Sequence, residues 1–84
     1  MLVKTLIDNA SKIVGTRYKL AKIMGVSPSQ VYDWQEERKR CSPADRARLA
    51  AFGGSDAVRE LVDATIADYA GTIRGDQLAV ALQR

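Results

Sequence analysis

Apolar positions recur at helical spacing along most of the chain, and Gly, Ser-Pro and Thr residues interrupt them. The fold class that this pattern predicts is all-α, a bundle of about five helices plus a short C-terminal helix. Their expected ranges are 4–14, 16–24, a helix beginning at 28, 43–52, 56–70 and 77–83.

The first expected helix carries one apolar stripe with i, i+3, i+4, i+7 spacing. Its members are Val3, Leu6, Ile7, Ala10, Ile13 and Val14. Lys4, Asp8 and Lys12 lie on the opposite face, and Gly15 ends the helix. The pattern predicts a buried stripe with a structural role only.

Two short helices between residues 20 and 40 are expected to share one apolar underside. Its members are Leu20, Ala21, Met24, Val31 and Trp34. Gly25 suits a turn that needs positive φ, and the small side chain of Ala21 lets the helices cross closely. Ser27 before Pro28 is typical of a helix start, with Gln30 placed to complete a capping box.

This segment resembles the helix-turn-helix of the Cro and λ-repressor-like (XRE-type) regulators of phages and bacteria. The matching residues are Leu20-Ala21, Gly25-Val26-Ser27, Val31 and Trp34, with Gly15-Thr16 before them and Ser42-Pro43 after them. The resemblance covers roughly residues 3–52. It implies that the second helix lies across a DNA backbone and that the third enters the major groove.

The resemblance implies base contacts from the outward residues of the third helix. These are Pro28, Ser29, Gln30, Tyr32 and Asp33. Ser hydroxyl donates or accepts, Gln grips adenine in two places, and Tyr packs on a thymine methyl or reaches a phosphate. Pro28 and Asp33 depart from the family pattern: Pro28 offers only apolar contact, and Asp33 either accepts from a cytosine amino group or pairs with a nearby cation.

The resemblance likewise implies phosphate contacts from the second helix and from the segment after the third. These residues are Thr16, Arg17, Lys19, Lys22, Arg38, Lys39 and Arg40. A helix N-terminus with nearby cations favours an anion. The alternative is that these side chains form ordinary solvated surfaces.

Charge is distributed unevenly along the chain. Residues 1–48 contain ten Lys and Arg against five Asp and Glu, whereas residues 49–84 contain three against five. The basic half therefore coincides with the resemblance, as expected for a surface that faces phosphate. Residues 1–84 are expected to form one domain. With no long apolar run and no signal peptide, we expect no membrane partner and a cytoplasmic location.

The chain has one cysteine and no histidine. Ser-His-Asp and Cys-His catalysis, an intrachain disulfide and a zinc site are therefore excluded. We expect no enzyme activity, cofactor, metal or small-molecule ligand. Cys41 lies beside cations and before a helix start, which could lower its pKa, but we interpret it as a loop or half-buried residue.

Gly53-Gly54 marks an internal boundary, after which residues 55–84 are expected to form C-terminal helices. Ser55 is the expected cap of the first of these. Its apolar stripe is Val58, Leu61, Val62, Thr65, Ile66 and Tyr69. The stripe is interpreted as a homodimer interface, or alternatively as part of the core of one chain.

These features lead to a hypothesis about function. The chain is expected to be a sequence-specific double-stranded DNA-binding regulator, a Cro or repressor-type phage protein that acts as a dimer by promoter occlusion. One alternative is the autoregulating antitoxin of a toxin–antitoxin pair, in which residues 55–84 hold the toxin. Another is a protein-binding module that has lost specific DNA binding.

Overall fold

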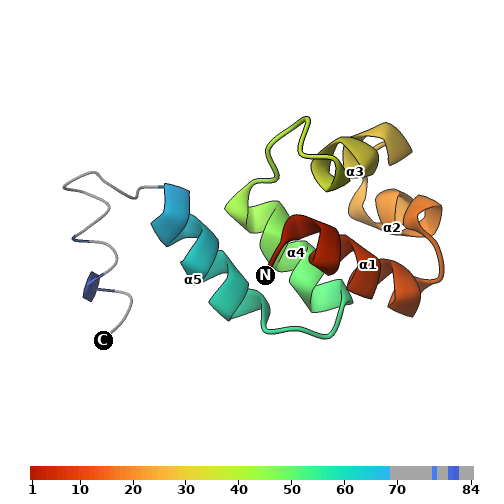
Figure 1. Ribbon diagram of the computed structural model, residues 1–84. Helices are drawn as coiled ribbons and strands as arrows, with labels where there is room; N and C mark the ends of the chain where they lie inside the picture. The colour runs from red at the N-terminus through yellow and green to blue at the C-terminus, as the bar shows by residue number, and fades with distance from the viewer. Residues whose placement is uncertain (69–76, 78–79, 82–84) are drawn as a thin grey trace.

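The computed structural model describes residues 1–68, 77, 80 and 81, and five helices account for most of them (Figure 1). They are α1 Val3–Val14, α2 Arg17–Met24, α3 Pro28–Gln35, α4 Pro43–Phe52 and α5 Ala57–Asp68. The described residues contain no strand, so the all-α expectation is confirmed for this part. The expected helix over 77–83 and Tyr69 lie largely outside the described residues.

Three helices begin where the sequence predicts, and a side chain caps each of them. The side-chain oxygens of Thr16, Ser27 and Ser42 each accept a hydrogen bond from the backbone amide three residues later, at 3.1, 3.1 and 3.2 Å. Each bond satisfies an amide that has no partner within the helix. The expected starts of α2, α3 and α4 are therefore confirmed.

The start of α5 differs by one residue from expectation. The carboxylate of Asp56, and not Ser55, accepts from the backbone amide of Arg59, at 3.0 Å. Ser55 instead donates its own backbone amide to the carbonyl of Ala50 at 2.8 Å, closing the preceding turn. Because Ser55 belongs to the end of α4, the capping role passes to the next polar residue.

Three turns end helices in the same way, at residues with positive φ. Gly25, Glu37 and Gly54 have φ of 74°, 59° and 75°. In each turn this residue donates its amide to the carbonyl three residues back, and the next residue donates to the carbonyl five back, at 2.8–3.3 Å. This is the Schellman arrangement, which usually places glycine at the left-handed position. Glu37 is the exception.

The core is formed by α1 to α4 around Trp34. The buried apolar residues are Val3, Leu6, Ile7, Ala10, Leu20, Ala21, Met24, Val31, Trp34, Cys41, Leu49 and Ala50. Trp34 is the largest of them and is only 1% exposed. Its expected position on the apolar underside is confirmed.

The predicted stripe of α1 is wrong at its C-terminal end. Ile13 is 64% exposed, whereas Ser11 is buried. Gly53 lies so close to α1 that a Cβ placed there would be 3.1 Å from the Asn9 Cβ and 3.2 Å from the Ala10 backbone nitrogen. A Cβ placed at Gly54 would be 3.7 Å from the Ile13 Cδ1, so the turn after α4 borders this side chain without covering it.

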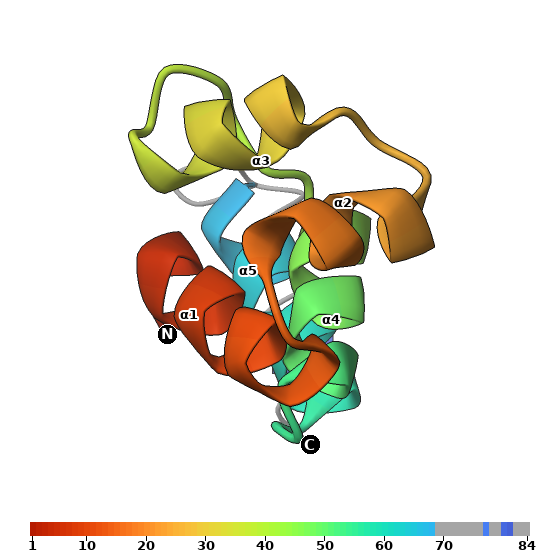
Figure 2. The same ribbon diagram turned by 90° about the vertical axis from the view of Figure 1, so that its right-hand side faces the viewer.

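Helix α5 packs against α4 (Figures 1 and 2). Its buried side chain is Glu60, whose Oε1 accepts from Arg46 of α4 at 2.8 Å, and whose other oxygen lies 3.8 Å from the amino group of Met1. The apolar residues Val58 and Leu61 are 72% and 41% exposed. The alternative interpretation, that this stripe is part of the core of one chain, is therefore wrong at these two positions.

Candidate nucleic-acid interface

Helices α2 and α3 meet at an angle across the turn at Gly25, side by side at one end of the molecule (Figure 2). Leu20 and Ala21 of α2 are fully buried against Val31 and Trp34 of α3. Because the apolar undersides of both helices are buried in this contact, their remaining side chains lie on the outer surface. The residues expected to contact DNA belong to this outward surface and to the loop that follows α3.

The first turn of α3 presents side chains with no partner. Pro28 and Ser29 are exposed and Gln30 is half-buried. Among the described residues, neither the Ser29 hydroxyl nor the Gln30 amide makes a side-chain hydrogen bond. The backbone amide of Gln30 is occupied by Ser27, but its side-chain donors and acceptor remain available for a ligand. The reciprocal half of the predicted capping box does not form.

The second half of α3 contacts the loop that follows it. The Tyr32 ring is 47% exposed, and the Arg38 guanidinium carbon lies 5.2 Å from its centroid, in cation–π range. The Asp33 carboxylate, with 21% of its side chain exposed, lies 3.6 Å from the Lys39 amino group. Asp33 therefore forms the cation pair that the sequence left as one of its two possible roles.

Arg17, at the start of α2, is held from two sides. Its Nη2 pairs with the carboxylate of Asp8 on α1, and its Nε donates to the side-chain oxygen of Gln35 on α3 at 2.7 Å. The guanidinium thus connects three helices while half of the side chain stays exposed. A shallow depression of about 490 Å³, lined partly by Thr16 and Arg17, lies beside it.

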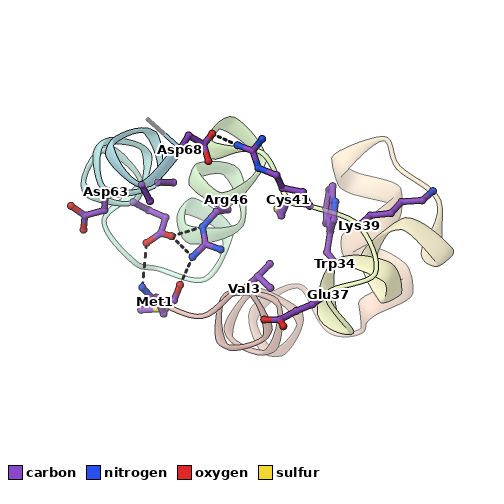
Figure 3. Close-up of a pocket in the computed structure, with 13 residues that line it drawn as sticks. Met1, Val3, Trp34, Glu37, Lys39, Cys41, Arg46, Asp63 and Asp68 are labelled. Atoms are coloured by element: carbon purple, nitrogen blue, oxygen red, sulfur yellow. Dashed lines mark hydrogen bonds and ion pairs between the residues drawn. The ribbon is translucent and has the colours of Figure 1, made fainter. Parts of the chain in front are cut away.

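The other expected phosphate contacts differ from one another. Lys19 and Lys22 are exposed on α2 and form no ion pair within the described part of the chain. Thr16 uses its hydroxyl oxygen as the cap of α2, which leaves its proton free to donate. Arg40 pairs with Asp68 at the end of α5, and Figure 3 marks this ion pair at the labelled carboxylate. The three adjacent basic residues of the loop therefore point to different partners.

The backbone of the loop after α3 is fixed by the carbonyl of Asp33. It accepts from the amides of both Arg38, at 2.8 Å, and Lys39, at 3.3 Å. The left-handed conformation of Glu37 allows both amides to reach this one carbonyl oxygen. Both the backbone and the side chain of Asp33 therefore determine where the two cations lie.

Three residues of this surface were missed by the sequence interpretation. Tyr18 is 68% exposed on α2, one turn before Lys22, and the two line a depression of about 260 Å³ with Pro28. The i, i+4 spacing of Tyr18 and Lys22 would have placed them together. Asp8 and Gln35 were missed because their contacts with Arg17 join helices that are distant in sequence, and no local pattern indicates that.

A second cavity, of about 530 Å³, lies between α5 and the loop after α3 (Figure 3). Trp34 and Cys41 line it, and Arg46 with Glu60 lies at its edge. Burial, assisted by the charge of Asp45, raises the pKa of the Cys41 thiol to about 12. Neighbouring cations therefore do not bring this pKa below its ordinary value, because Cys41 is buried more deeply than the loop or half-buried position that the sequence indicated.

The described residues contain neither a membrane-spanning helix nor a metal-binding cluster. None of their helices is long and apolar enough to cross a bilayer. In the same part of the chain, no three His, Cys, Asp or Glu side chains gather in a way that could hold a metal ion.

Comparison with known proteins adds no identification. No protein-family model, no curated protein and no solved structure matches the chain.

Proposed function

We propose that the chain is a sequence-specific double-stranded DNA-binding regulator of the Cro and λ-repressor-like type. The observation that carries this proposal is the surface formed by α2, α3 and the loop after α3. Two short helices bury one apolar underside and expose a first turn with free polar groups at Ser29 and Gln30. Residues 16–40 hold six basic side chains against three acidic ones.

The chemistry of this surface suits a duplex. The polar first turn of α3 matches what the major groove offers, namely donors and acceptors on base edges. Lys19, Lys22, Arg38 and Lys39 are exposed around it, where they can neutralise phosphates and release counterions. In this arrangement the phosphate contacts set the orientation and the first turn reads the sequence.

A homodimer is part of the proposal, with α5 as the contact. Val58 and Leu61 are exposed apolar residues on this helix, and Arg59 and Asp63 flank them. An antiparallel second copy, related by a two-fold axis near Leu61, brings Arg59 of each chain toward Asp63 of the other. Two copies would then present two α3 helices to successive major grooves, about 34 Å apart, and exclude polymerase from a promoter.

Selection of bound duplexes from a random library tests the proposal with the purified protein. The expected result is enrichment of an inverted repeat whose half-sites are about ten base pairs apart. A single enriched half-site would keep the regulator and reject the dimer. No enrichment at low salt, by a protein that circular dichroism shows to be folded, would reject DNA recognition.

One alternative is supported by a specific observation. The exposed apolar residues Val58 and Leu61 of α5 would equally suit a different protein, as in an antitoxin that holds its toxin. Leu61→Ser separates the two cases, because it should reduce self-association of a homodimer measured by sedimentation. A chain that is monomeric with or without this substitution, and that co-purifies with the product of a neighbouring gene, would favour the antitoxin.

A further inference from the structure

The outward side chains of α3 fall into two groups. Those of the first turn, Pro28, Ser29 and Gln30, make no side-chain hydrogen bond or ion pair among the described residues. Those of the second half each hold one basic residue. Tyr32 contacts Arg38 at 5.2 Å, Asp33 contacts Lys39 at 3.6 Å, and Gln35 accepts from Arg17 at 2.7 Å.

All three of these basic residues are among the expected phosphate contacts. They come from two different segments, the start of α2 and the loop after α3. The second half of α3 is therefore the common support of cations from both sides. A flexible Arg or Lys loses side-chain entropy when it binds a phosphate, and a support that orders it beforehand reduces that loss.

We propose that the second half of α3 positions the phosphate-binding cations and that only residues 28–30 read bases. Tyr32 and Asp33 are then positioning residues instead of base contacts. This inference rests on the proposed function. It predicts a short half-site, because one helical turn of reading side chains spans only a few base pairs.

The present partners of Asp33 and Tyr32 make direct contact with a base costly for both side chains. To accept from a cytosine amino group, the Asp33 carboxylate would leave Lys39 and approach the phosphates with its charge uncompensated. To pack on a thymine methyl, the Tyr32 ring would give up the Arg38 guanidinium. When they hold the cations, both residues contribute to binding without leaving their present contacts.

Tyr32 provides the sharper experiment, because two substitutions separate its ring from its hydroxyl. Tyr32→Phe keeps the ring under Arg38 and removes the hydroxyl, whereas Tyr32→Leu removes the ring. Selection from a random duplex library and salt titrations on the selected and a random duplex are measured for both variants. Gln30→Ala serves as the comparison that alters reading.

The positioning role predicts that Tyr32→Phe leaves the selected sequence, the affinity and the salt slope unchanged. Tyr32→Leu should weaken binding to both duplexes by about two- to five-fold, with the same selected sequence. If the loss of the ring releases Arg38 from its phosphate, the log–log salt slope becomes shallower by about 0.9 for each bound chain. Gln30→Ala should instead change the selected sequence. An altered base preference in Tyr32→Phe or Tyr32→Leu would overturn the proposal.

Asp33 is tested by a double-mutant cycle with Lys39. Asp33→Asn removes the ion pair, so Lys39→Ala should weaken binding less in that background than in the wild type. Glu36→Gln removes the same charge from an exposed residue that forms no ion pair within the described part of the chain, and it is the matched control, in which the effect of Lys39→Ala should be unchanged. Equal effects of Lys39→Ala in all three backgrounds would overturn the role of Asp33.

The outcomes for the two levels of the proposal can be told apart. If the wild type binds duplexes with a sequence preference but Tyr32 or Asp33 variants shift that preference, only the positioning role fails. If the folded wild type selects no sequence, the proposed function fails and the positioning role is overturned with it. A preference that moves with Gln30 alone supports both.

Discussion

Helices α3 and α5 are both amphipathic, but they differ in how completely their apolar residues are buried. Helix α3 turns Val31 and Trp34 inward, each 1% exposed, and leaves its polar residues outside. Helix α5 turns Glu60 inward and leaves Val58 and Leu61 largely exposed. The comparison shows that helical periodicity identifies a face but not what covers it.

The difference follows from what each helix meets. Helix α3 contacts both α1 and α2, and the large ring of Trp34 fills the space among the first four helices. Helix α5 packs against α4. Only 23% of the Arg46 side chain on α4 is exposed, so its buried charge requires a compensating charge. Glu60 supplies that charge, and the pair is buried where α5 also places the half-buried Ala57 and Ala64.

The largest expected effect comes from truncating the inward side of α3. Trp34→Ala should lower the free energy of unfolding by about 3–5 kcal/mol, because it removes the largest buried side chain and leaves a cavity. Urea denaturation followed by circular dichroism measures it. In a domain this small, the variant is expected to be close to unfolded.

Tyr32→Ala, on the outward side of the same helix, is the control. It should change stability by about 1 kcal/mol or less, since it loses only an exposed cation–π contact. Similar losses in the two variants would show that α3 does not have one buried and one free side.

The inward side of α5 is tested by Glu60→Ala. Removing one partner of a buried ion pair leaves Arg46 uncompensated, and the expected loss is about 3 kcal/mol. Asp63→Ala breaks the exposed pair with Arg59 on the same helix and should cost less than about 1 kcal/mol. If Asp63→Ala costs as much as Glu60→Ala, then α5 is not anchored by its buried carboxylate.

Smaller changes in stability, of opposite sign, are expected at two of the helix ends with positive φ. Glu37→Gly should raise the free energy of unfolding by about 1 kcal/mol, because it relieves the left-handed strain of a residue with a Cβ. Gly25→Ala should lower it by about the same amount, since it introduces that strain at φ 74°. Denaturation midpoints of both variants give the values. If both substitutions changed the free energy of unfolding in the same direction, the left-handed turn conformation would not be the cause of the changes.

The mildest expected effect concerns Cys41 and has no consequence at neutral pH. Its thiol has a pKa of about 12 in the folded chain against 9.0 for a free thiol. The native state therefore holds its proton more tightly, so this contribution to stability is complete below pH 9 and is lost between pH 9 and 12.

The Cys41 effect is measured by alkylation at pH 9. A thiol reagent should modify native Cys41 much more slowly than the thiol of the urea-unfolded chain. Cys41→Ala should remove the corresponding part of the pH dependence between 9 and 12. Equal alkylation rates in the folded and unfolded chain would contradict the buried position.

The caps and the core around Trp34 were predictable because their causes are local. Thr16, Ser27 and Ser42 bond to amides three residues away, and the spacing of Val31 and Trp34 sets their common face. The partners of Arg17 and Arg40 were not predictable. Asp8 and Asp68 reach them from other helices, and their approach depends on how the helices cross.

The candidate interface shows the same division. Its members are close in sequence, so the resemblance could name Ser29, Gln30 and the basic residues together. What each side chain contacts depends on the end of α3, where Glu37 adopts positive φ and turns the loop back on the helix. No local preference of glutamate indicates that conformation, so the division of α3 into two groups emerged only from the structure.

The ion pair between Glu60 of α5 and Arg46 of α4 has a consequence for the order in which the helices unfold locally. Helices α1 to α4 each contribute apolar side chains that are at most 1% exposed, whereas the most buried residue described on α5 is Glu60. Amide hydrogen exchange should therefore be fastest in α5 among the helices, and the other four should be protected as one cooperative unit. Helix α5 could then separate and re-dock while the surface formed by α2 and α3 stays folded.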